Sequence, residues 1–263
     1  MWDIGISSAC YYPQPTEEAF LKICKSDVKL IEIFFNTFSE LSDSFLNKLI
    51  HIKNNYDVKV SSVHPFLSFA ETYFLFSDYE RRFYDTLEIY KKFFEVTRKL
   101  GSDIFIIHGL KEKGVIEDNQ YFDRFAKLIE IGKQYGVRVC QENVVLYRSQ
   151  SSEYLKRMSD YIGQDFNIVL DIKQAKRANE DPFKIIEAVG DRICHVHISD
   201  HNALHTCLPP FEGDFNFSAF LKKMKDINYL GNFIIELYSN SYHNESQIYN
   251  SLKKLKNCSL IIE

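Results

Sequence analysis

The sequence lacks the features that mark several large classes of protein. Its 263 residues include only 10 glycines and 6 prolines. No interior stretch is rich in glycine, proline or serine, so we expect one domain over residues 1–263. The motifs GxGxxG, GxxxxGK[ST] and GxSxG are absent, which argues against a dinucleotide-binding fold, a phosphate-binding loop and a hydrolase nucleophile elbow. The six cysteines form no CxxC pair, which disfavours a cysteine zinc site and favours reduced thiols in a cytoplasmic protein.

Long apolar stretches and excess positive charge are also missing. The start, MWDIGISSACYYP, has neither the basic segment of a signal peptide nor an apolar run long enough to span a membrane. Lysine and arginine number 32 against 36 acidic residues, a formal net charge of -4, whereas proteins that bind nucleic acid usually carry a basic face. We therefore expect a soluble protein without a membrane or nucleic-acid partner.

What the sequence does contain is a series of eight short apolar runs. We expect strands at residues 2–7, 30–35, 58–64, 103–108, 137–142, 166–171, 193–199 and 232–236. Most of these runs are continuous rather than alternating, which is typical of strands buried on both faces in a parallel sheet. Helical patterns separate them, the longest over residues 78–100 and ended by Gly101. Eight strand–helix repeats predict an α/β protein with a single (β/α)8 TIM barrel.

Four of the eight runs end in a residue type that binds metal ions. These residues are Glu142, Asp171, His197 and Glu236. Oxygen and nitrogen ligands of this kind suit a hard or borderline divalent cation, and the carboxyl ends of barrel strands meet at the rim where active sites form. Simpler roles exist for each residue alone, such as a helix cap for Asp171 or a rim ion pair for Glu236. The four together favour a metal site.

Other histidines and aromatic residues extend this pattern. In ICHVHIS we expect His195 and His197 to point to opposite faces of their strand, with His197 facing the barrel centre and His195 facing a helix. His64 and His108 end the third and fourth strands. Each could be a metal ligand, a hydrogen-bond donor to substrate or a buried core residue. Because two histidines stand at equivalent strand ends, a role in the site is favoured. After the third strand, five aromatic residues could cover a pocket, pack within their loop or contact another subunit: Phe66, Phe69, Tyr73, Phe74 and Phe76.

The order of the four strand-end ligands resembles that of the xylose isomerase-like TIM barrels. This group includes sugar phosphate isomerases and epimerases, ketose 3-epimerases, inosose dehydratases and the endonuclease IV family. The most specific stretch is HVHISD followed by PPFEGDFNFSAFLKKMKDINYLGNFIIE, in which Tyr229, Gly231 and Glu236 match the family's Tyr-x-Gly … Glu run. The resemblance implies one divalent ion (manganese, zinc, cobalt or magnesium) on the four ligands, with Glu142 and Glu236 as acid/base partners.

The resemblance also suggests which residues contact a substrate and which reactions to consider. The residues that would bind substrate are His64, His108 and Gln174. Gln174 stands where the family often has a histidine. In endonuclease IV, the histidines that match His64 and His108 bind further zinc ions. We favour a metal-dependent isomerase or epimerase of a sugar, sugar phosphate or cyclitol, working by proton transfer next to a chelated carbonyl. The alternatives are a zinc phosphodiesterase acting on abasic DNA, an inosose-type dehydratase, or a barrel that binds a sugar without converting it. The resemblance further implies a homodimer or homotetramer.

Overall fold

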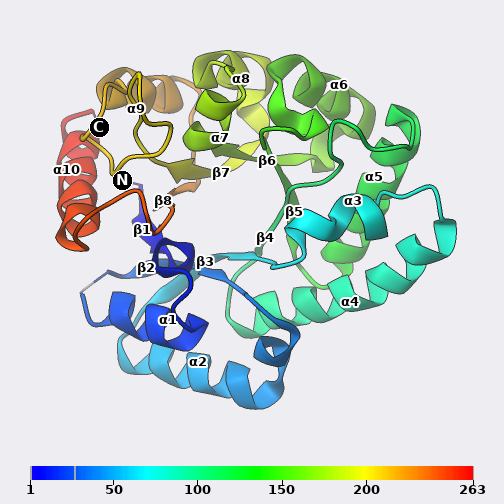
Figure 1. Ribbon diagram of the computed structural model, residues 1–263, viewed down its shortest axis with the longest axis horizontal. Coiled ribbons are helices and arrows are strands. Elements are labelled where there is room, and N and C mark those ends of the chain that lie inside the picture. Colours follow the sequence, from blue (N-terminus) through cyan, green and yellow to red (C-terminus); the bar gives the residue numbers. More distant parts are fainter. Residues whose placement is uncertain (1, 27, 263) are drawn as a thin grey trace.

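The strands form a closed parallel barrel. The computed structural model describes residues 2–26 and 28–262. Its strands pair in sequence order, and β1 and β8 pair with each other to close the barrel (Figure 1). The strands are β1 (Ile4–Ser7), β2 (Leu30–Phe34), β3 (Lys59–His64), β4 (Ile104–Ile107), β5 (Arg138–Glu142), β6 (Asn167–Asp171), β7 (Ile193–Ile198) and β8 (Asn232–Ile235). The predicted (β/α)8 TIM barrel is confirmed, and each predicted strand overlaps an observed one.

Helices surround the barrel and cover the outer faces of the strands (Figure 1). They are α1 (Thr16–Cys24), α2 (Asp43–Asn55), α3 (Glu71–Phe74), α4 (Glu80–Lys99), α5 (Asp118–Gln134), α6 (Ser152–Ile162), α7 (Ile172–Arg177), α8 (Pro182–Val189), α9 (Phe217–Asp226) and α10 (Ser246–Ile262). In α4, Phe83, Leu87, Tyr90 and Phe94 recur at helical spacing and are buried. Gly101, with φ of 85°, follows the end of this helix, as predicted.

One irregularity in the sheet affects the site. Along the β6–β7 pair, Ile168 is opposite Ile193 while Val169 is opposite His195. Cys194 is therefore an extra residue on β7, which is a β-bulge. Bulges redirect neighbouring side chains, and this one lies in the strand that carries His197.

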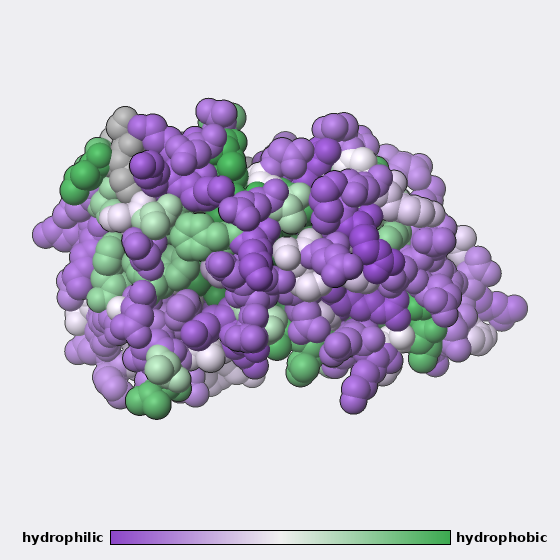
Figure 2. All heavy atoms as spheres, turned by 90° about the horizontal axis from the view of Figure 1, so that it is seen from above, coloured by the Kyte–Doolittle hydropathy of each residue, from purple (hydrophilic) through white to green (hydrophobic). Residues whose placement is uncertain are grey.

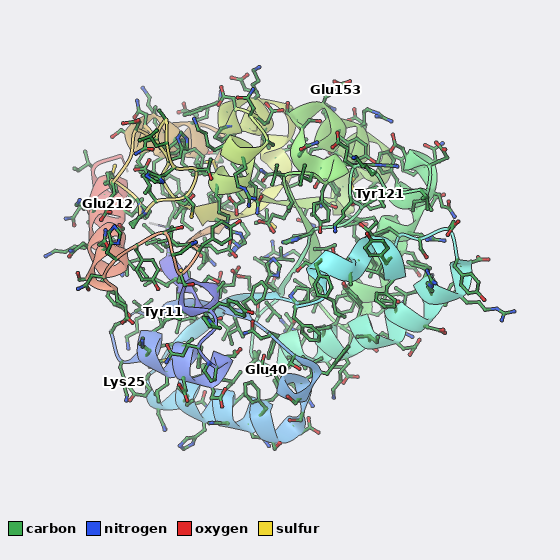
Figure 3. The ribbon with its side chains drawn as sticks, in the orientation of Figure 1. Tyr11, Lys25, Glu40, Tyr121, Glu153 and Glu212 are labelled. Atoms are coloured by element: carbon green, nitrogen blue, oxygen red, sulfur yellow. The ribbon has the colours of Figure 1, made fainter. Side chains whose placement is uncertain are left out.

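Residues near the two ends of the chain are linked by side-chain hydrogen bonds beside the β1–β8 pair. Tyr11, labelled in Figure 3, lies in the 3-10 helix η1 (Ser8–Tyr11). Its hydroxyl group shares a hydrogen bond of 2.7 Å with the hydroxyl group of Tyr249 in α10. Trp2 also donates a hydrogen bond to the carbonyl oxygen of Tyr229 at 2.7 Å. The barrel is therefore closed by side chains as well as by strand pairing.

The face of the molecule seen in Figure 2 is mostly polar. In the face shown in Figure 2, hydrophilic residues surround separate hydrophobic patches rather than a continuous apolar band. Within residues 2–26 and 28–262, no helix combines the length and the apolar character that a bilayer crossing needs.

Candidate metal centre

The four predicted ligands meet at the carboxyl ends of the strands. Glu142, Asp171, His197 and Glu236 each offer a ligand atom, and these atoms all lie within 4.8 Å of one another. Nδ1 of His197 lies 3.4 Å from Oε1 of Glu142, 3.6 Å from Oδ2 of Asp171 and 3.3 Å from Oε2 of Glu236. All four side chains are buried. The structure thus brings together the set that the sequence predicted.

Glu32 fixes the orientation of the central histidine. Oε2 of Glu32 lies 2.9 Å from Nε2 of His197, and the Ser62 hydroxyl donates to the same oxygen at 2.6 Å. A carboxylate that accepts the Nε2 proton leaves Nδ1 of the imidazole free to bind a metal ion. Burial disfavours a charged imidazole, but the carboxylates of Glu32 and Glu236 raise the pKa of His197 well above its ordinary value, so a metal ion would have to replace the proton on Nδ1.

Sequence reasoning missed Glu32, although a signal was present. It is a charged residue inside the apolar run LIEIF, and a fully buried carboxylate needs cationic or hydrogen-bonding partners. Burial alone would raise the pKa of Glu32, but His197 and His195 hold it well below its ordinary value. Glu32 therefore remains a carboxylate that can orient His197.

The expected orientation of His195 is wrong. Nε2 of His195 lies 3.2 Å from Oε2 of Glu32 and 3.1 Å from the Ser62 hydroxyl oxygen, inside the barrel. Side chains two residues apart on a strand point to the same face, so His195 faces inward together with His197. His195 lies one layer deeper than His197 and supports Glu32.

Asp171 caps a helix and also faces the candidate site. It is the N-cap residue of α7, where its Oδ1 accepts a hydrogen bond from the Gln174 backbone NH at 2.9 Å. The other oxygen, Oδ2, faces His197. Asn143 fixes the backbone of Asp171, because its amide group bonds both the NH and the carbonyl of that residue. One carboxylate thus starts a helix and contributes to the site.

A buried lysine, which the sequence did not reveal as a site residue, balances the acidic charge. Nζ of Lys173 lies 2.6 Å from Oε2 of Glu236 and 3.1 Å from Oδ2 of Asp171. Burial would lower the pKa of the Lys173 ammonium, yet Asp171 and Glu236 raise it well above its ordinary value. In turn, Lys173 and His197 lower the pKa of Glu236 despite its burial.

A second group of possible ligands adjoins the first. His64, His108 and Glu142 offer atoms within 4.8 Å of one another. The Nε2 atoms of His64 and His108 are 3.0 Å apart, and Oε2 of Glu142 lies 3.0 Å from the second of them. Burial alone would raise the pKa of Glu142, but His108 and His197 lower it well below its ordinary value. Glu142 therefore joins both groups as a charged carboxylate.

The carboxylates fit a divalent cation. Oε2 of Glu142 and Oδ2 of Asp171 are buried and have no hydrogen-bond donor among residues 2–26 and 28–262. Oε2 of Glu142 lies within ion-pair distance of His108, and Oδ2 of Asp171 lies within ion-pair distance of Lys173, but neither contact is a hydrogen bond. Buried carboxylate oxygens with lone pairs still available are suited to a hard or borderline metal ion.

A cavity of about 470 Å³ opens above these ligands. Its lining includes His64, His108 and Gln174, the three predicted substrate contacts, together with Glu142 and Glu236. A volume of this order suits a small ligand. A larger cavity of about 610 Å³ lies at the other mouth of the barrel and contains none of the four ligands.

The aromatic residues after β3 divide between the alternatives considered for them. Phe66 and Phe69 line the cavity, and Phe69 is 68% exposed. Phe76 is instead fully buried and packs edge-on against Tyr121 of α5 (Figure 3). Tyr73 is exposed and contacts the Lys111 ammonium through its ring. Part of this segment therefore borders the site, and part is packing.

The sequence matches the family described as "Xylose isomerase-like TIM barrel" over residues 22–258. This chain belongs to that family. The uncharacterized protein MJ1311 of Methanocaldococcus jannaschii is 27% identical over 247 residues, which cover 88% of this chain and 82% of that protein.

Solved structures share the same fold. A D-tagatose 3-epimerase-like protein is 24% identical with a TM-score of 0.81, covering 100% of this chain and 98% of its own. The IOLI protein, solved with a bound zinc atom, is 16% identical with a TM-score of 0.76, covering 100% of this chain and 98% of its own.

Proposed function

We propose that this protein is a divalent-metal-dependent isomerase or epimerase of a sugar, sugar phosphate or cyclitol. The observation that carries the proposal is the cluster of Glu142, Asp171, His197 and Glu236 within 4.8 Å, buried beneath a cavity. The named structural neighbours, an epimerase-like protein and a zinc-containing protein of the same fold, support it.

The four residues would hold the cation. When bound, it would act as a Lewis acid that stabilises negative charge developing on a substrate oxygen. Glu32 would keep Nδ1 of His197 turned toward the site, since it accepts the proton on Nε2. Lys173 would limit the net negative charge that the four ligands and Glu32 create in a buried space.

Glu142 and Glu236 would move the proton. Glu142 ends β5 and Glu236 directly follows β8, so they would approach a bound substrate from different sides. One carboxylate would take a proton from the carbon next to the carbonyl, and the other would return one to the opposite face. His64 and His108, which line the cavity, would orient hydroxyl groups.

Charge-neutral variants of the two glutamates test this assignment. We expect Glu142→Gln and Glu236→Gln each to reduce turnover at least about 10²-fold, because proton transfer by positioned groups contributes roughly 10²–10⁴-fold. The measurement is exchange of the substrate's carbon-bound hydrogen with deuterated solvent, in a screen of ketoses and cyclitols with manganese, cobalt, magnesium or zinc. Glu153→Gln, on the exposed face of α6, is the matched control. Full activity with an intact fold in either site variant would remove that residue from the mechanism.

A zinc phosphodiesterase on abasic DNA is the second candidate. The adjacent group of His64, His108 and Glu142 favours it, since it could hold a further zinc ion. Gln174 counts against a third ion, because its side-chain oxygen accepts a hydrogen bond from the Val145 backbone NH at 3.3 Å. Metal-dependent incision of abasic DNA by the purified protein would reverse our preference.

A further inference from the structure

Two cysteine thiols meet inside the barrel, on the amino-terminal side of the predicted metal ligands. Sγ of Cys140 on β5 lies 3.2 Å from Sγ of Cys194 on β7. Cys194 is the second residue of β7, and Cys140 is the middle residue of β5. The bulge at Cys194 accounts for the contact, since the extra residue on β7 brings its side chain into the barrel beside Cys140.

The surroundings of the two thiols differ. Cys140 is fully buried and packs with Ile104, Ile106 and Val169. Cys194 is only partly buried and lines the cavity of about 610 Å³ at the amino-terminal mouth. Of the two residues, Cys194 is the one that borders this cavity, so we expect an oxidant entering it to meet Cys194 before Cys140.

Nearby charge favours reaction at Cys194. Arg138, which is paired with Asp103 at 2.9 Å, lines the same cavity. The hydrogen bond with Cys140 and the charge of Arg138 lower the pKa of the Cys194 thiol. A thiolate, rather than a thiol, is the nucleophile in thiol oxidation.

We propose that Cys140 and Cys194 form an oxidisable dithiol site, in which a peroxide entering the amino-terminal cavity converts the pair into a disulfide between β5 and β7. The proposal does not rest on the proposed isomerase activity. The two sulfurs must approach from 3.2 Å to about 2.05 Å.

The chemistry balances in two steps. The Cys194 thiolate attacks one oxygen of the peroxide, the O–O bond breaks, and the leaving hydroxide takes a proton to become water. The sulfur is oxidised to a sulfenic acid and the peroxide is reduced. The Cys140 sulfur then attacks the sulfenic sulfur, and the hydroxide that leaves combines with the Cys140 proton as a second water.

Peptide mapping of the folded wild-type protein tests the proposal without any variant. After limited treatment with hydrogen peroxide, we expect the intact mass to fall by the mass of two hydrogen atoms. We also expect a pair of peptides joined through Cys140 and Cys194, and full reversal of both changes by dithiothreitol. In Cys140→Ala, Cys194 should stop at the sulfenic acid and be trapped by dimedone. Cys258→Ser is the control, because Cys258 is also partly buried and its thiol contacts the Ser218 hydroxyl at 3.7 Å rather than a second thiol.

Two results would overturn the proposal. One is oxidation of Cys258 while Cys140 and Cys194 both stay reduced. The other is a Cys194 sulfenic acid that persists in the wild type without a bond to Cys140. If Cys140→Ala does not fold, the mapped wild-type peptides still decide between these outcomes.

Discussion

The proposed metal site depends first on a single buried carboxylate, that of Glu32, which accepts a hydrogen bond from Nε2 of His197. We expect Glu32→Gln to weaken metal binding by about 10–100-fold, the usual effect of losing the residue that orients a ligand histidine. Competition with a metal chelator measures the affinity. Glu71→Gln is a matched control, because Glu71 is equally buried but does not belong to any of the ligand groups found among the described residues. Equal affinities for the wild type and Glu32→Gln would contradict this role.

Glu71 makes its own prediction about pH. Burial raises its pKa from 4.5 to about 8, and it accepts hydrogen bonds from the Gly109 NH and the Tyr90 hydroxyl. The folded protein thus keeps a proton that the unfolded chain loses above pH 4.5, so this group makes stability fall as pH rises from about 5 to about 8. Glu71→Gln should remove that dependence, leaving the variant more stable at pH 8 by on the order of a few kcal/mol.

Urea unfolding of the wild type and Glu71→Gln at pH 5 and pH 8 measures the difference. The gap in unfolding free energy between the two proteins should widen in favour of the variant at the higher pH. A gap that stays constant across this range would show that Glu71 is ionised in the folded protein at both pH values.

The residues that sequence reasoning found and missed differ in a physical way. Glu142, Asp171, His197 and Glu236 end apolar runs, so chain position alone places them at the rim. Lys173 follows Asp171 by two residues and looks like an ordinary helix-surface lysine. Its burial depends on Glu236, which is distant in the sequence, and a single sequence does not show such a contact.

At the scale of elements, the turn after β4 positions His108. Tyr121 of α5 donates a hydrogen bond to Oε1 of Gln141, and Nε2 of Gln141 donates to the His108 carbonyl at 2.8 Å. Gly109 follows with φ of 85°, and a Cβ at this position would lie 2.1 Å from the Tyr121 hydroxyl oxygen. The absence of a side chain at Gly109 therefore allows this helix–strand–turn contact.

We expect Gly109→Ala to destabilise the protein by about 1–3 kcal/mol for the backbone conformation and further for the clash with Tyr121. Gly163→Ala is the matched control, because its φ is 84° but no heavy atom lies within 4 Å of the added Cβ. Thermal unfolding separates the two costs. If both variants lose the same stability, Tyr121 and Gln141 move aside freely and do not hold His108.

The element boundaries were predictable because buried parallel strands give continuous apolar runs. The bulge in β7 was not predictable, since an extra residue in a strand leaves no mark on hydrophobicity. The inward direction of His195, by contrast, follows from strand alternation alone, and the contrary expectation was an error in applying that rule.

At the scale of the whole molecule, closing the barrel assembles the site. Glu32 on β2 and His197 on β7 are 165 residues apart in the sequence, yet their side chains are 2.9 Å apart. The family's strand order predicts which ligands converge, but the contacts across the barrel interior arise only once β1 pairs with β8. The fold and the positions of the four candidate ligands were therefore accessible from the sequence, whereas the supporting residues required the structure.

Metal content is the most direct test of the central claim that Glu142, Asp171, His197 and Glu236 form a metal site. Elemental analysis of the purified protein and of Glu236→Gln, before and after reconstitution, measures it. The account predicts one divalent ion per chain in the wild type and a lost or weakly held ion in the variant. About three zinc ions per chain would favour the phosphodiesterase, and no bound metal after reconstitution would contradict the account.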